Sequence, residues 1–265
     1  MAVEKVVMYQ NTSVLHDEIL AHRFGLLPVL ADPDLFDLRE ESEPFAENNT
    51  IKFYLNVKCV RKPGQSEESA EQLSHADRLD NHLVLAAHVH WEPLGEQATR
   101  LSSRPPRILH DQILLCKLAE GQEIEAELYA TKGVGKTHTK WSPVCTAFYR
   151  LFPSVRIAEP VTGADAEEIK ALCPTGVFDI EDVGSGKARQ KRLTVASEER
   201  CTTCRACVGH ELLGSRFELG KRPNRYHFTV ESVGVLPPTV IFGKALEVLR
   251  EKATYYQSFL AKPAN

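Results

Sequence analysis

Residues 11–28 read NTSVLHDEILAHRFGLLP and carry the signals of a short helix between two turns. Asn11-Thr12-Ser13 supplies side-chain oxygens that can accept hydrogen bonds from the unpaired N–H groups of a first helical turn. Gly25 is typical of the residue that follows a helix, and Pro28 prevents continuation. We therefore predict a helix from about Val14 to Phe24. Its apolar stripe consists of Val14, Leu15, Ile19 and Leu20.

The sequence on either side of this helix is rich in strand patterns. Ala2–Gln10 partly alternates apolar and polar residues, as a short strand does. Thr50–Val60 alternates more regularly, and Glu123–Ala130 places glutamates between apolar residues, which is typical of a strand with one exposed face. Further apolar runs lie at 82–90, 112–119 and 142–152. Residues 30–153 are therefore expected to form a β-rich domain.

The last part of the chain changes character. A short helix is expected at Ala164–Leu172, followed by a hairpin around Glu181–Lys187, a basic loop at Lys221–Arg225 and a strand at Tyr226–Ser232. Pro237-Pro238 then opens a helix that continues from Val240 to Leu260. Its apolar and aromatic side chains favour contact with a partner. The candidate partner-binding residues are Ile241, Ala245, Val248, Leu249 and Tyr256, together with Leu20 and Phe24 of the first helix.

The composition limits the functions that the chain can have. Its 265 residues carry a formal net charge of −4, whereas an autonomous nucleic-acid-binding protein usually has a basic face. This balance does not exclude a subunit of a larger nucleic-acid machine. No apolar run approaches the roughly 18 residues needed to cross a bilayer, and the first residues lack the pattern of a signal peptide. A soluble, intracellular protein without membrane contact is expected.

Three of the seven cysteines stand at three-residue intervals, at Cys201, Cys204 and Cys207, and Cys173-Pro174 lies upstream. An odd number of cysteines in a reducing compartment argues against a disulfide framework. Bacterial ferredoxins hold 4Fe–4S clusters with C-x₂-C-x₂-C runs and a Cys-Pro. The four cysteines therefore match the ligand set of a single 4Fe–4S cluster. Zinc, with His210 as a further ligand, and a loop of free thiols are the alternatives.

No motif supports catalysis by this chain. The run Gly133-Val-Gly135-Lys136-Thr137 resembles the end of a phosphate-binding loop, but that motif requires glycine where this sequence has Ala130. His82, His88 and His90 alternate without a neighbouring cysteine or carboxylate cluster, so exposed strand histidines are expected. We find no serine-nucleophile elbow, zinc-protease motif or dinucleotide fingerprint.

Three stretches resemble segments of one family, the α-like subunits of archaeal and eukaryotic RNA polymerases. They are residues 11–28, quoted above, residues 132–144 (KGVGKTHTKWSPV) and residues 228–238 (FTVESVGVLPP). The resemblance covers nearly the whole chain, and the chain looks like the larger α-like subunit shared by eukaryotic polymerases I and III.

The resemblance implies an α+β fold in three parts. A dimerisation domain is split between 1–29 and 220–265, a β-rich insert domain spans 30–153, and a small ferredoxin-like module spans 154–219. It also implies that a strand and a dimerisation helix of the family are missing before residue 1, so this form is expected to pair weakly with its partner. The cysteines at 173, 201, 204 and 207 stand where relatives carry cluster ligands.

The function implied by the resemblance is assembly rather than catalysis. The α-like subunit pairs with a smaller α-like subunit, and this heterodimer is the platform for the large catalytic subunits, in the nucleolus and nucleoplasm. The chain would then have no catalytic residue and no direct sequence-specific contact with DNA. An iron–sulfur electron-transfer or redox-sensing protein is the alternative, and only the cysteines support it.

Overall fold

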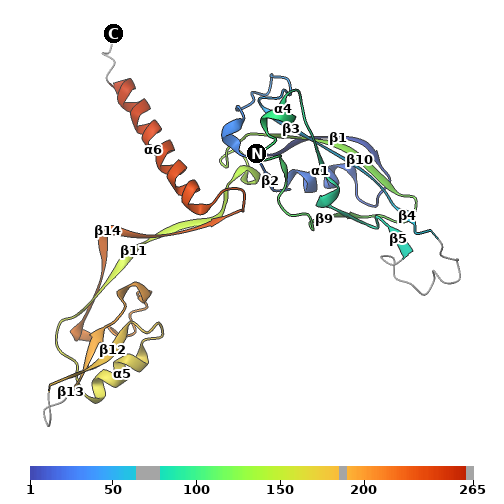
Figure 1. Cartoon of the computed structure of the whole chain (residues 1–265). Helices are drawn as coiled ribbons and strands as arrows, with labels where there is room; N and C mark the ends of the chain where they lie inside the picture. Colours follow the sequence, from blue (N-terminus) through green and yellow to red (C-terminus); the bar gives the residue numbers. More distant parts are fainter. Residues whose placement is uncertain (64–77, 185–189, 261–265) are drawn as a thin grey trace. The chain divides into compact units, whose positions relative to one another are not determined.

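The computed structural model describes residues 1–63, 78–184 and 190–260, which divide into two compact units (Figure 1). The first unit comprises Met1–Cys145 and Glu231–Asn265, and the second comprises Thr146–Val230. The fold is α+β, with many strands and few helices. Among the described residues, no helix combines the length and the apolar character needed to cross a membrane.

The first unit is built on a four-stranded antiparallel sheet. Its strands, in spatial order, are β1 (Ala2–Asn11), β10 (Glu123–Thr131), β3 (Thr50–Lys58) and β7 (His90–Glu92). Shorter strands pair in separate two-stranded sheets: β2 (Val29–Leu30) with β8 (Arg107–Ile108), β4 (Val60–Arg61) with β5 (Leu79–Asp80), and β6 (Leu83–Leu85) with β9 (Leu114–Lys117). The short helical elements are η1 (Pro33–Leu35), η2 (Ala86–His88), α4 (Gln97–Arg100) and η3 (Thr139–Trp141).

The alternation of β3 and β10 gives this sheet one buried and one polar face, because successive side chains of a strand point to opposite sides. The buried face carries Ile51, Phe53 and Leu55 of β3 and Ile124, Ala126 and Leu128 of β10. On the polar face, Lys52 Nζ lies 2.6 Å from Glu127 Oε1 and 3.1 Å from Glu92 Oε2. Hydrogen bonding from Lys52 and Tyr129 holds the pKa of Glu127 below its ordinary value.

The first helix, α1 (Asp17–Gly25), begins three residues later than the sequence predicts. Asn11 and Ser13 close a turn before the helix instead of capping it: the backbone N–H of Ser13 donates to Asn11 Oδ1, and Asn11 Nδ2 donates to the carbonyl of Leu15. The buried side of the helix also differs from the predicted apolar stripe. Val14 is 84% exposed, whereas Leu20 and Phe24 are fully buried in the core of the first unit.

The first 29 residues share a sheet and a core with the residues that follow. β1 pairs with β10 over almost its whole length, and Val3 packs in the same cluster as Leu128 and Phe53. The packing therefore does not separate residues 1–29 from 30–145, in contrast to the division at residue 30 that the resemblance implies. An edge strand with eight paired residues is held in place by its backbone hydrogen bonds.

The second unit is a small α+β module around its own core. Helix α5 (Ala164–Leu172) contacts the hairpin of β12 (Phe178–Val183) and β13 (Gln190–Val195), and the core includes Ile169, Phe178 and Leu193. Two short turns, η5 (Glu198–Arg200) and η6 (Gly214–Arg216), follow. Helix α5 matches the prediction, and residues 185–187 of the expected hairpin lie outside the described residues.

Two long strands, β11 (Val144–Ile157) and β14 (Phe217–Ser232), pair as a two-stranded sheet. The basic segment 221–225, which the sequence predicts to be a loop, lies within β14. The boundaries between the two units fall within these strands.

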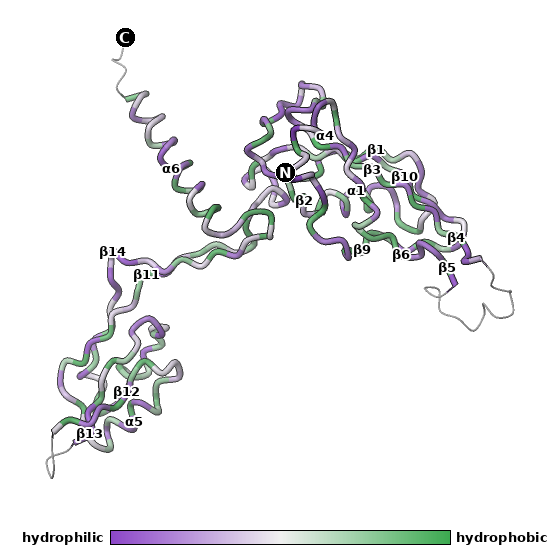
Figure 2. The backbone as a smooth tube through the Cα atoms, viewed as in Figure 1, coloured by the Kyte–Doolittle hydropathy of each residue, from purple (hydrophilic) through white to green (hydrophobic). Residues whose placement is uncertain are grey.

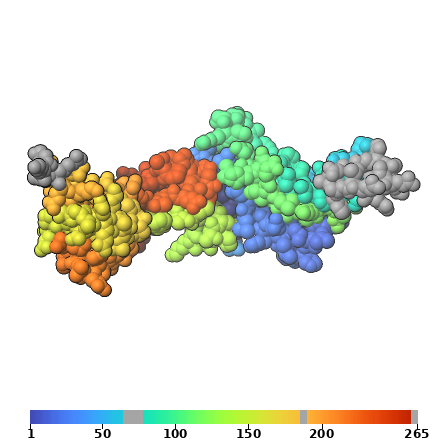
Figure 3. Space-filling view, turned by 90° about the horizontal axis from the view of Figure 1, so that it is seen from below, coloured from blue at the N-terminus to red at the C-terminus, as the bar shows by residue number. Residues whose placement is uncertain are grey.

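The last helix, α6 (Pro238–Leu260), has 23 residues and no buried side chain. Figure 2 shows hydrophobic and hydrophilic positions interspersed along it, and its surface is the red region of Figure 3. Lys244 forms a salt bridge with Asp34 of the first unit.

Replacing Phe53 by Ala should lower the free energy of unfolding of the first unit by about 3–5 kcal/mol, because the aromatic ring is fully buried in the sheet core. Denaturant unfolding followed by circular dichroism measures this loss. Val14→Ala is the matched control, since Val14 is mostly exposed, and it should leave the midpoint almost unchanged. Equal effects of the two substitutions would contradict the assigned core.

Candidate metal centre and helix surface

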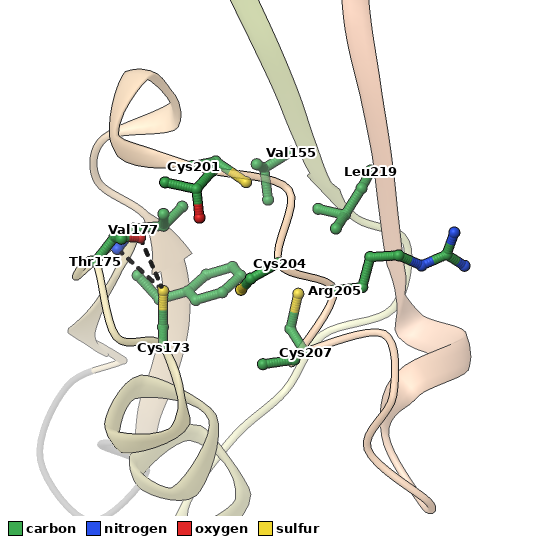
Figure 4. Close-up of a pocket in the computed structure, with 12 residues that line it drawn as sticks. Val155, Cys173, Thr175, Val177, Cys201, Cys204, Arg205, Cys207 and Leu219 are labelled. Atoms are coloured by element: carbon green, nitrogen blue, oxygen red, sulfur yellow. Dashed lines mark hydrogen bonds between the residues drawn. The ribbon is translucent and has the colours of Figure 1, made fainter.

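Four cysteines from separate segments of the second unit line one pocket (Figure 4). Cys173 follows α5, Cys201 follows η5, and Cys204 and Cys207 lie in the loop beyond. The remaining walls are mainly apolar and include Val155, Val177, Phe178 and Leu219. The structure therefore brings together all four cysteines that the sequence singles out.

Backbone N–H groups near the cysteines donate hydrogen bonds to two of the sulfur atoms. Thr203 and Arg205 adopt left-handed conformations, with φ of 57° and 65°, which are uncommon for residues other than glycine. In this turn the N–H of Thr203 donates to Cys201 Sγ at 3.4 Å. The N–H of Val177 donates to Cys173 Sγ at the same distance. Donors directed at sulfur stabilise the thiolate, which is the form that binds metals.

The thiols of Cys173 and Cys207 differ in their acidity. Burial opposes ionisation of Cys173, but hydrogen bonds from the backbone of Val177, Thr175 and Gly176 outweigh it, and its pKa lies below the ordinary value. Burial raises the pKa of the Cys207 thiol, and negative charge on Cys201 adds to the rise. Cys173 is therefore the more readily ionised of the two.

The donor chemistry suits a thiolate-bound metal, although the pocket is not a closed ligand cage. Soft thiolates are the ligands that zinc and iron–sulfur clusters share. The cavity between the side chains has a volume of only about 20 Å³, which accommodates about a single water molecule. Within the described ranges, no three or more His, Cys, Asp or Glu side chains are grouped closely enough to hold a metal ion. The sulfur atoms would have to move closer together to bind one.

His210, the additional zinc ligand that the sequence offered, does not line this pocket. Its Nδ1 accepts hydrogen bonds from the backbone N–H groups of Leu212 and Leu213, at 3.3 Å and 3.2 Å. The proton must then be on Nε2, which lies 3.0 Å from Glu168 Oε1. Because both ring nitrogens are engaged, the structure argues against His210 as a metal ligand.

The residues expected to bind a partner separate into two groups. Leu20 and Phe24 are fully buried between α1 and the sheet, so their side chains cannot reach a partner, and this part of the prediction is wrong. The α6 residues Val248, Leu249 and Tyr256 are exposed, Ala245 is exposed as well, and Ile241 is half-buried. The sequence reasoning missed Phe242 and Leu246, which are also exposed. Their spacing from Leu249, at i, i+4 and i+7, is the signal that finds them.

Comparisons with known proteins assign the chain to a family. The RNA polymerase Rpb3/RpoA insert domain matches residues 6–144. The mouse protein named DNA-directed RNA polymerases I and III subunit RPAC1 is 42% identical over 253 residues, which are 95% of this chain and 71% of that protein. The chain belongs to the Rpb3/RpoA-related family of RNA polymerase subunits. The RPAC1 of Saccharomyces cerevisiae is 36% identical over 97% of this chain and 76% of its own length. The archaeal subunit Rpo3 of Methanosphaera stadtmanae is 30% identical over 98% of this chain and 84% of its own length.

The family match covers most of the first unit. It begins at residue 6, inside β1, and ends at residue 144, where β11 starts. It therefore includes α1 and the second half of β1. The cysteine pocket lies outside the matched insert domain, and so does α6.

In the metal-free chain, Cys173 should react with iodoacetamide at lower pH than Cys207. Its lowered pKa leaves more thiolate as the pH falls, whereas the raised pKa of Cys207 delays ionisation to higher pH. Mass spectrometry of chelator-treated protein, labelled over a pH series, gives the two midpoints. Cys145, which is exposed, is the internal control that shows that enough reagent is present at each pH. A lower midpoint for Cys207 would contradict the hydrogen bonding assigned to Cys173.

Proposed function

We propose that this chain is a non-catalytic assembly subunit shared by DNA-directed RNA polymerases I and III, acting in the nucleolus and nucleoplasm in the transcription of rRNA and small RNAs. The observation that carries the proposal is the 42% identity, over 95% of the chain, to a protein whose name assigns it to both polymerases. The yeast and archaeal relatives support a polymerase role, because they too are named as polymerase subunits. Catalysis then belongs to the large subunits.

The exposed side of α6 is the surface that we assign to pairing with a smaller α-like subunit. Phe242, Leu246, Leu249 and Tyr256 recur at helical spacing and are all exposed. Burying one such side chain in an interface contributes about 1.5–3 kcal/mol, so a helix that covers this stripe would bind through several of them. The resulting heterodimer would then dock the large catalytic subunits. This order of assembly follows the family resemblance.

An electron-transfer or redox-sensing function is the alternative based on the cysteines alone. None of the relatives reported above carries a name of that kind. The cysteine pocket occupies one part of the second unit, whereas the similarity to polymerase subunits extends over nearly the whole chain. We therefore retain the polymerase role.

The proposal predicts that an affinity-tagged chain, expressed in its own cells, co-purifies with the other subunits of both polymerases. Leu249→Asp should reduce recovery of the smaller α-like subunit at least tenfold, because it places a charge within the apolar stripe. Thr254→Asp is the matched control: it adds the same charge to an exposed position of α6 outside the apolar stripe. Quantitative mass spectrometry measures recovery. Purification without any polymerase subunit would refute the function, and equal recovery with both variants would refute the assigned helix face.

We further propose that Cys173, Cys201, Cys204 and Cys207 hold a single 4Fe–4S cluster, with zinc as the competing occupant. The support is that four thiols line one apolar pocket and that backbone N–H groups already point at two of the sulfurs. A bound cluster would supply cross-links among three segments of the second unit. The chain's own contribution is to present the thiolates and exclude water around them.

Anaerobic purification should yield a coloured protein with visible charge-transfer absorption and about four irons per chain, as a cubane cluster requires. Cys204→Ser should abolish the colour. Cys145→Ser should retain it, because Cys145 is exposed and does not line the pocket. A colourless protein with one zinc per chain would establish the competing occupant instead.

A further inference from the structure

Two arginines of the second unit lie over an aromatic ring that is not part of the cysteine pocket. Arg222 and Arg225 of β14 lie over the ring of Phe152 on β11, with guanidinium carbons 5.7 Å and 3.8 Å from the ring centroid. Together with residues 195–199 they line an open hollow of about 470 Å³. Stacking on an aromatic face restrains a guanidinium while leaving its in-plane N–H groups able to donate.

The two arginines differ in their pairing. Arg222 donates to Glu198 Oε2 at 2.6 Å, and the other oxygen of this carboxylate accepts from the backbone N–H of Val155. The Glu198 carboxylate is therefore occupied on both oxygens by contacts within the unit. Arg225, by contrast, forms no salt bridge with any carboxylate in the part of the chain that the structure describes. It is a restrained cation at the edge of an open hollow.

We propose that this hollow is a docking site for an acidic segment of a partner polypeptide, whose Asp or Glu side chain pairs with the guanidinium of Arg225. A planar guanidinium can bind a carboxylate through two parallel N–H···O hydrogen bonds. Because Phe152 already restrains the Arg225 side chain, binding costs less conformational entropy than it would at a free surface arginine. Val195 and Ala196 of the hollow offer apolar contact to the methylene groups of the incoming side chain.

The hollow offers too few cations for a nucleic acid. Arg222 is already paired with Glu198, which leaves Arg225 as the partner for one incoming carboxylate, and Glu199 also lines the hollow. Nucleic-acid binding draws its affinity from several phosphate contacts at once, which this site does not offer. Glu199 should also weaken docking of an acidic peptide, and this gives the proposal a substitution that strengthens binding.

The test is direct binding of a fluorescein-labelled peptide of alternating Gly and Glu, with an amidated C-terminus, to the full chain. Fluorescence anisotropy should show saturable binding, and the same peptide with Gln for Glu should not bind. R225E should weaken binding about tenfold or more, because one charge-assisted pair is replaced by repulsion. E199Q should strengthen it. K221E is the matched control, since Lys221 is exposed on the same strand but does not line the hollow, and its effect should stay within about twofold.

Equal losses for R225E and K221E would overturn the proposal, because they would reflect general charge rather than this site. Tighter binding of an oligouridylate than of the Glu peptide would also overturn it. An unchanged affinity in E199Q would count against the assigned hollow even if R225E failed to fold, which the thermal unfolding midpoint reveals. The outcome is independent of the proposed polymerase role, since the isolated chain and a synthetic peptide suffice.

Discussion

The position of β10 between two antiparallel neighbours is the constraint on which the first unit depends. Its residues face β1 on one side and β3 on the other, and Leu128 stands opposite Val6 and Phe53. With this register Ile124, Ala126 and Leu128 enter the core, and the glutamates at 123, 125 and 127 remain on the polar face. A slip by one residue would bury the three carboxylates, so the alternating sequence specifies a single pairing. Lys52 reinforces it by bridging Glu127 to Glu92 across three strands.

The sequence predicted an element well where the residues of that element alone determine its structure, and poorly where contacts with distant residues determine it. The strand at 50–58 and the helix at 164–172 lie where alternation and helical spacing place them. Helix α1 was predicted less well, because Asn11 and Ser13 use their side chains for a turn that competes with capping. The burial of Phe24 could not be predicted either, because it depends on contacts between α1 and strands that are far from it in the sequence, such as β9. Likewise, nothing in residues 221–225 shows that they continue a strand, whose partner lies some 70 residues earlier.

The candidate sites show the same division. The spacing of Cys201, Cys204 and Cys207, together with Cys173-Pro174, led to the prediction of one ligand set; the four cysteines line one pocket, and the bound metal stays a prediction. The sequence could not show that both ring nitrogens of His210 form hydrogen bonds, because their partners, the backbone of Leu212 and the side chain of Glu168, are brought to the ring only by folding. It also gave no sign of the ring of Phe152 beneath Arg225, since the two residues meet only when β11 and β14 pair. Helical spacing pointed to α6 as a partner surface, which stays a prediction, and it left out the exposed Phe242 and Leu246.

The exposed apolar side chains of α6 have a consequence for the free chain in the cell. A helix with no buried side chain gains little from packing on its own unit, and exposed apolar side chains promote association with other chains. Newly synthesised chains that have not yet bound a partner would therefore aggregate or bind chaperones, and more of them would do so the longer they remain unbound. Supply of the partner, rather than synthesis of this chain, would then set how much of it persists.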